Sequence, residues 1–170
     1  MTPTAPSKRV LIRDLLILQL KLVIDAVKDV LLIKVALFAV IFDTGEDPVA
    51  GLTRFAEEQN LSGAGFTAIG AFSAATLGYF AWEKKDYERI PVEEQVEVLA
   101  LVGDIAIQDD NRKKVHAHVV LGRRDGSACG GHLLAAKVRP TLEVILTESP
   151  SYLRRVHDRE TGLALIRIGA

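Results

Sequence analysis

Apolar runs of strand length alternate with polar, turn-forming segments along most of the chain, a pattern typical of antiparallel strands. We expect strands at 35–42, 66–80 with a bend at Gly70, 96–107 with a break at Gly103, 115–133 as a hairpin, 142–147 and 163–168. The run 35–42 contains no polar residue, which predicts a strand buried on both faces. The charged segment 83–95 is expected to be irregular, and 151–155 to form a short helix or turn.

One helix is expected directly after the first of these strands. Asp47 is a good N-cap because its carboxylate can accept hydrogen bonds from free backbone N–H groups, and Pro48 suits the first helical position. Apolar residues follow at helical spacing at Val49, Leu52, Phe55 and Ala56, and Asn60 is expected to end the helix. The prediction is an α/β (α+β) fold, with a mainly antiparallel β-sheet and one packed helix.

The N-terminal segment 8–34 has a different pattern. On a helical wheel five of its charged residues, at positions 14, 21, 25, 28 and 29, gather within an arc of about 100°, while Leu, Ile and Val occupy most of the remaining surface, interrupted by the polar residues at 13, 19 and 34. This predicts a long apolar helix with surface for two contacts, one to its own domain and one to another chain, although the alternation at 18–22 also fits a strand. The residues expected at the second interface are Leu15, Leu18, Leu22, Val23, Val30 and Ile33.

Composition limits the partners and the compartment. The chain has 170 residues, which suits a domain at 35–170 preceded by an extension at 1–34. A net charge of −1 argues against nucleic acid as a partner. The charge-free runs 15–20 and 35–42 are far shorter than the ~20 residues of a membrane span, and the charge-free segment 61–82 is too polar for one. One cysteine and the lack of a secretory signal in residues 1–7 indicate a cytoplasmic protein.

The hairpin at 115–133 holds three of the four histidines. His116 and His118 are two residues apart, so a strand points both imidazoles to one face. The loop length decides where His132 lies. A three-residue loop, 124–126, places His118 opposite His132, whereas a two-residue loop at 125–126 turns His132 to the other face.

A cluster of His116, His118 and His132 would suit a metal ion, most plausibly zinc, because three imidazoles leave a fourth position for water. The alternative is that the three histidines form hydrogen bonds at a subunit interface and hold no ion. Cys129 has no recognisable oxyanion hole or partner, so no catalytic residue is assigned.

Four stretches, in this order, resemble the plants-and-prokaryotes conserved (PPC) domain. They are Thr44-Gly45-Glu46-Asp47, the run 68–80 from Ala68-Ile69-Gly70 to Gly78-Tyr79-Phe80, the run 97–105 from Glu97-Val98-Leu99 to Asp104-Ile105, and the hairpin that ends Gly130-Gly131-His132-Leu133. The resemblance implies a mainly antiparallel α/β domain that forms a homotrimer. The three histidines match the motif positions with which some bacterial members are thought to hold a metal, so the resemblance also implies a metal site.

The resemblance has departures that bear on function. Some prokaryotic members are described as DNA-binding by analogy with plant proteins that attach the domain to AT-hooks, but no Arg-Gly-Arg-Pro hook occurs here. The plant Gly-Arg-Phe-Glu run is replaced by 94–97, in which only Glu97 matches. Glu97 and Asp104 are the family-motif acids that could serve the histidines as a base or an orienting group.

Three functions follow from these observations. The first is a homotrimeric assembly module whose apolar N-terminal helix, a segment we hypothesise to be engineered, adds a second interface and builds a larger symmetric assembly. The alternative is a metal-dependent enzyme or a metal-binding protein that uses the three histidines. The second alternative is a DNA-associated regulator. The sequence leaves enzymatic activity open and favours a non-catalytic role.

Overall fold

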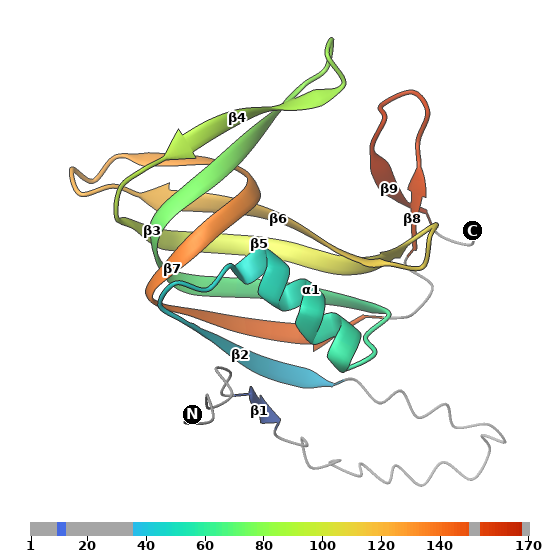
Figure 1. Cartoon of the computed structure of the whole chain (residues 1–170), viewed down its shortest axis with the longest axis horizontal. Helices are drawn as coiled ribbons and strands as arrows, with labels where there is room; N and C mark the ends of the chain where they lie inside the picture. Colours follow the sequence, from blue (N-terminus) through green and yellow to red (C-terminus); the bar gives the residue numbers. More distant parts are fainter. Residues whose placement is uncertain (1–9, 13–35, 150–153, 168–170) are drawn as a thin grey trace, which may run out of the picture.

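The computed structural model describes residues 10–12, 36–149 and 154–167. In these residues one helix packs against a nine-stranded sheet (Figure 1). The elements are β1 (Val10–Ile12), β2 (Leu37–Asp43), α1 (Pro48–Glu58), β3 (Gly63–Ala81), β4 (Asp86–Val92), β5 (Val96–Gln108), β6 (Lys113–Gly122), β7 (Ala128–Glu148), β8 (Arg154–His157) and β9 (Ala164–Arg167). The predicted class, mostly β-sheet with one short packed helix, is confirmed.

The strands curl into a partly closed sheet. The main path runs β1-β2-β7-β3-β5-β8-β9, with β4 beside β3 and with β6 joining β5 to β7. The pairs β3–β5, β5–β6, β6–β7 and β7–β3 therefore close a ring. All these pairs are antiparallel, and the parallel contact of β8 with β5 lies outside the ring. The curl separates an inner face from an outer face.

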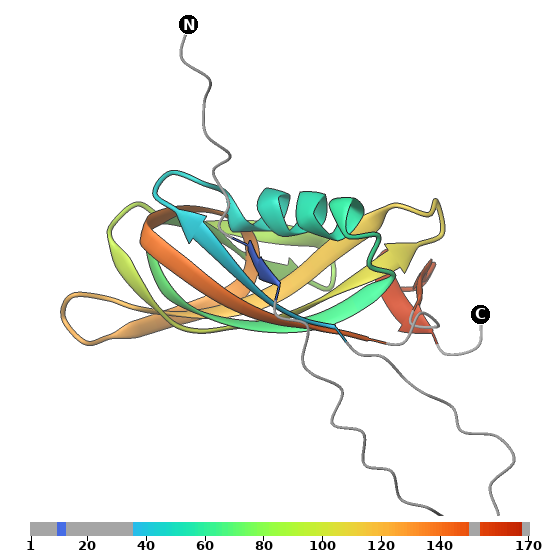
Figure 2. The same ribbon diagram turned by 90° about the horizontal axis from the view of Figure 1, so that it is seen from below.

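The inner face forms the core, which α1 covers from one side (Figure 2). In β2, Phe38, Val40 and Phe42 are buried, while the residues between them are more exposed. The prediction that this strand is buried on both faces is therefore wrong. Phe38 meets Phe55 of α1 edge to face, with ring centroids 5.3 Å apart. Each such buried side chain stabilises the fold by about 1.5–3 kcal/mol.

Local signals set the start and end of α1 as predicted. Asp47 is the N-cap, and its Oδ1 accepts hydrogen bonds from the backbone N–H of Val49 at 2.8 Å and Ala50 at 3.1 Å. Pro48 is the first helical residue. The helix ends at Glu58, just before Asn60 takes a positive φ of 52°.

The N-terminal segment does not support the long apolar helix. Val10–Ile12, inside the expected helix, form the antiparallel strand β1 beside β2. Without β1, β2 would have an open edge of unpaired backbone groups, and the β-branched Val10 and Ile12 suit a strand at that position. The remainder of 8–34, including the six expected interface residues, lies outside the described residues. The hypothesis of an engineered helix therefore has no support among them.

Three smaller predictions are also corrected. The segment expected to be irregular contains β4, whose side chains are exposed at most positions, so no apolar alternation reveals the strand. β5 continues through Gly103, and its register shifts instead between Val98 and Ala100. Residues 154 and 155, expected in a helix or turn, belong to β8. The described helix is too short to cross a membrane.

Candidate metal centre

The hairpin between β6 and β7 has the three-residue loop that brings the histidines together. The backbone N–H of Arg123 donates to the carbonyl of Ser127 at 2.8 Å, and Gly126 takes a left-handed φ of 83°. In this register His118 lies directly opposite His132. The two-residue alternative, which would place His132 on the other face, is excluded.

The glycines before His132 allow the strands to approach closely. A Cβ atom at Gly130 would lie 2.7 Å from the carbonyl oxygen of Val119 on β6. A Cβ at Gly131 would lie 3.0 Å from the carbonyl oxygen of Gly78 on β3. A side chain at Gly130 would therefore displace β7 from β6 and His132 from His118.

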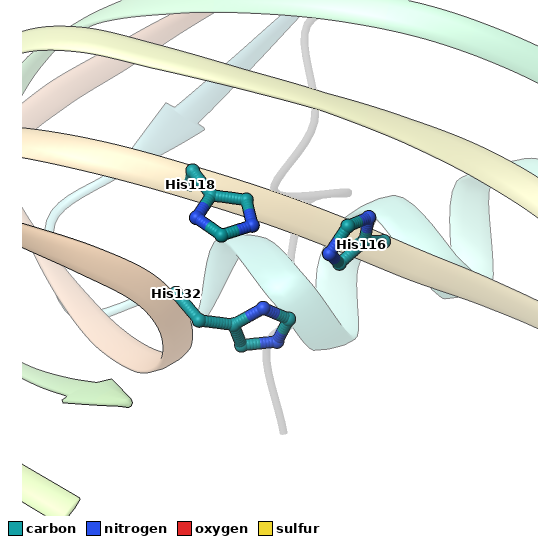
Figure 3. A group of neighbouring side chains, drawn as sticks. All are labelled: His116, His118 and His132. Atoms are coloured by element: carbon teal, nitrogen blue, oxygen red, sulfur yellow. The ribbon is translucent and has the colours of Figure 1, made fainter. Parts of the chain in front are cut away.

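The three imidazoles gather on the outer face of the sheet. On β6 the neighbours Val115, Ala117 and Val119 are buried in the core, so His116 and His118 point the opposite way. His132 reaches the same space from β7, and the three rings face one another (Figure 3).

The distances in this cluster are close to those of a metal site. One nitrogen from each of the three histidines lies within 4.8 Å of the other two. In a tetrahedral site with Zn–N bonds near 2.1 Å, ligand nitrogens are about 3.4 Å apart. To bind such an ion, the nitrogens that lie farthest apart would have to move closer together.

One ring nitrogen of the cluster is also buried without a hydrogen-bond partner. The Nδ1 of His132 has no hydrogen-bond partner, and the Nε of Arg155 is the other such atom among the described residues. Leaving a buried polar atom unpaired costs about 1–3 kcal/mol. A metal ion among the histidines could accept the lone pair of this ring nitrogen.

Asp104 lies behind His116, opposite it in the pairing of β5 with β6. Its Oδ2 is 3.5 Å from the Nδ1 of His116. Both carboxylate oxygens also accept hydrogen bonds from the Nη2 of Arg155, at 2.7 and 2.8 Å. Histidine ligands of metal ions commonly donate their second nitrogen to such a carboxylate.

The ring of Tyr87 packs against the ring of His132. The two rings are tilted by 33° with centroids 4.6 Å apart. Tyr87 lies on β4, the strand that the sequence did not reveal. Gly78, opposite His132 on β3, makes room for it, since a Cβ there would lie 2.8 Å from the Tyr87 ring.

The surroundings favour neutral imidazoles and a charged carboxylate. Burial, followed by the nearby charges of His116 and His118, lowers the pKa of His132 to about 4. Burial and then His116 also lower the pKa of His118. Burial alone would raise the pKa of Asp104, but hydrogen bonds from His116 and Arg155 outweigh it and lower that pKa. Neutral imidazoles retain the lone pairs that a metal ion requires.

The two acids named from the sequence differ in their placement. Asp104 lies beside His116, as described above. Glu97 is exposed at the far end of β5, opposite Gly122, and lines a shallow hollow with Ile69 and Glu143. Asp104 therefore belongs to the histidine cluster, and Glu97 does not.

Sequence reasoning missed Arg155 and Tyr87. Both come from strands outside the hairpin, and neither belongs to a motif with metal-site spacing. Arg155 lies 51 residues from Asp104 in the sequence. Arg155 stands in the charged run 154–159, and nothing in this run identifies a contact with Asp104.

The comparison with protein families assigns this fold to a known class. The model of the Plants and Prokaryotes Conserved (PCC) domain, the family called PPC above, matches residues 34–150. The chain belongs to this family. No curated protein matches the chain.

Solved structures agree with this assignment. A PPC protein from Pyrococcus horikoshii is 32% identical with a TM-score of 0.71, and the alignment covers 79% of this chain and 91% of that one. A metal-containing protein from Archaeoglobus fulgidus is 35% identical with a TM-score of 0.71, covering 82% and 99%. A protein from Bacteroides thetaiotaomicron, described as a candidate DNA-binding protein, is 26% identical with a TM-score of 0.75, covering 79% and 93%.

Proposed function

We propose that this PPC protein binds a divalent metal ion, zinc in the first instance, through His116, His118 and His132. The observation that carries the proposal is the gathering of three ligand nitrogens within 4.8 Å on one face of the sheet. Imidazole is a ligand that zinc accepts readily. The metal-containing relative from Archaeoglobus fulgidus, 35% identical, adds support.

Three protein ligands leave a coordination position open to water or a small molecule. A zinc ion held there would supply Lewis acidity and would lower the pKa of its bound water to about 7. The role of the chain is to hold three imidazoles on a rigid sheet, with Asp104 fixing the His116 ring. The site would therefore serve a metal-dependent enzyme or a metal-binding protein.

Zinc titration of the purified full-length chain tests this proposal. We expect one zinc per chain by equilibrium dialysis and elemental analysis. His118→Ala should reduce zinc affinity by more than about 100-fold without unfolding, because His118 is exposed. His157→Ala is the matched control, because it removes an exposed histidine outside the cluster, and it should bind like the wild type. Absence of zinc binding by the wild type would overturn the proposal.

We also propose that the chain associates with copies of itself, as a homotrimer, through the outer face of the sheet. Ile69, Val102, Val120 and Ile145 are 61, 57, 43 and 51% exposed on four neighbouring strands. Exposed apolar residues gathered on one face are typical of interaction surfaces. The family resemblance supports the trimer.

Light scattering tests the association. We expect a mass three times the 18.5 kDa of one chain. Val102→Glu should lower this mass, whereas Lys84→Glu, on an exposed turn, should not. The double variant Leu18→Glu with Leu22→Glu tests the second interface, the one expected in the N-terminal segment. If the wild type forms an assembly larger than a trimer and this variant forms only trimers, the second interface is supported. A monomeric wild type would contradict the proposal.

DNA binding is the least favoured function. The relative described as a DNA-binding candidate is 26% identical, and the net charge of −1 gives this chain little attraction to phosphate. We expect no salt-dependent binding to duplex DNA in an anisotropy titration.

A further inference from the structure

The C-terminal hairpin β8–β9 contributes to the histidine site, although it lies beyond residue 150, where the family match ends. β8 runs parallel to the end of β5, with Arg155 opposite Gln108. The backbone N–H of His157 donates to the Oδ2 of Asp109 at 2.9 Å, which fastens the hairpin to the turn after β5. These contacts place Arg155 beside Asp104.

Arg155 is held in one position. It is 7% exposed, which is rare for an arginine. Its Nη1 donates to the carbonyl of Ala164 on β9 at 3.0 Å, and its Nη2 donates to both oxygens of Asp104. The guanidinium therefore connects the hairpin to the carboxylate and restricts rotation of the carboxylate.

The carboxylate in turn faces His116. The Nδ1 of His116 lies 3.5 Å from the Oδ2 of Asp104 and 3.2 Å from the Nη2 of Arg155. A guanidinium only donates hydrogen bonds, so Arg155 can bond to Nδ1 only when that nitrogen carries its lone pair, whereas Asp104 can accept a proton from Nδ1. With the proton on Nδ1, the lone pair is on Nε2, the nitrogen left for a metal ion.

We propose that Arg155 is a positioning residue of the metal site, which acts through Asp104 to hold His116 with its Nε2 available to the metal. The proposal rests on the proposed function, metal binding by the three histidines. It makes the C-terminal hairpin part of the site in this chain.

If Arg155 acted on the site only through its charge, its removal would strengthen zinc binding. A guanidinium near the histidines repels a metal cation, so its removal would strengthen binding. Positioning predicts weaker binding when the two hydrogen bonds to Asp104 are lost, whether or not the charge remains. The sign of the change therefore distinguishes the two roles.

The experiment compares full-length Arg155→Met, Arg155→Lys and Asp104→Asn with the wild type. Zinc affinity is measured by competition with a chelator, and the coordination geometry by the visible spectrum of the cobalt(II) form. We expect each variant to bind zinc about 10- to 100-fold more weakly, with an altered cobalt spectrum. The control is Arg167→Met, which removes an exposed arginine from the same hairpin and should change neither readout.

The outcomes separate this proposal from the proposed function. If the wild type binds no zinc, metal binding itself fails. If the wild type binds zinc, and Arg155→Met and Arg155→Lys keep its affinity and cobalt spectrum or bind more tightly, the positioning role is overturned and the metal site stands. If Arg155→Met unfolds, Arg155→Lys decides, and wild-type affinity and spectrum in that variant overturn the proposal.

Discussion

Two hairpins meet at the histidine cluster, and they differ in how the sequence specifies them. The β6–β7 hairpin joins neighbouring residues through a three-residue loop, and it supplies all three histidines. The β8–β9 hairpin supplies one arginine and reaches the site only by its parallel contact with β5. Both turns contain an aspartate whose side chain accepts hydrogen bonds from a later residue, Ser127 or Thr161.

The difference shows that the three histidines and the arginine that supports them are positioned by different kinds of contact. The positions of the ligands follow from local turn geometry, which sets the register of two long strands. The support depends on a contact between segments about 50 residues apart, which local pattern does not specify. Changes in the first hairpin should affect both stability and metal binding, whereas changes in the second should mainly affect metal binding.

The largest effect is expected where β6 and β7 approach most closely. Gly130→Val should lower the free energy of unfolding by about 1–3 kcal/mol and weaken zinc binding, because its side chain would collide with the backbone of Val119. Urea unfolding and zinc titration measure both. Gly126→Ala is the control: its added methyl meets no atom within 4 Å, and only the φ of 83° opposes it. It should cost about 1 kcal/mol and retain zinc. Unchanged stability of Gly130→Val would contradict the close approach.

A smaller effect, on amide exchange, should distinguish the turn of the β8–β9 hairpin from that of the β6–β7 hairpin. Asp158 accepts hydrogen bonds from the N–H and hydroxyl of Thr161 at 3.0 and 2.8 Å. Asp158→Ala should speed amide exchange in β8 and β9 about tenfold and leave β6 and β7 protected. Asp125→Ala is the matched change in the other turn and should speed exchange at the ends of β6 and β7. Hydrogen exchange read residue by residue tests this, and identical patterns in the two variants would contradict independent hairpins.

The smallest effect concerns pH in the metal-free protein. The pKa of His132 is lowered from 6.5 to about 4 in the folded chain, so between these values the unfolded chain binds the additional proton. Stability from this group is therefore complete above pH 6.5 and is lost as the pH falls towards 4. In urea unfolding with a chelator present, His132→Phe should lose less stability than the wild type over this range. Parallel curves would show that His132 is not the cause.

Several predictions that relied on short-range chemistry were confirmed. Asp47 and Pro48 indicated the start of α1, because N-cap and first-turn preferences depend on adjacent residues. The bend at Gly70 was also expected, and this residue takes a φ of 149° at a register shift of β3. The grouping of the three histidines required only the correct loop length.

Predictions failed where the environment of a strand decides the outcome. β4 has few buried positions, so its sequence resembles a charged loop even though β3 pairs with it along its full length. β1 lies in a segment whose apolar residues fit a helix, but the open edge of β2 favours a strand. Asp104 was named as a candidate, whereas its partner Arg155 could be found only from the fold.

The 21-residue strand β7 has a consequence for how the chain folds. It pairs with β2, β3 and β6, and its pairings with β2 and β3 join residues that lie far apart in the sequence. Chains dominated by such distant pairings fold slowly, on a scale of about milliseconds to seconds. During synthesis β2 and β3 leave the ribosome before β7, so their open edges must avoid pairing with other chains until β7 arrives. We therefore expect the yield of refolded protein to fall as the chain concentration rises.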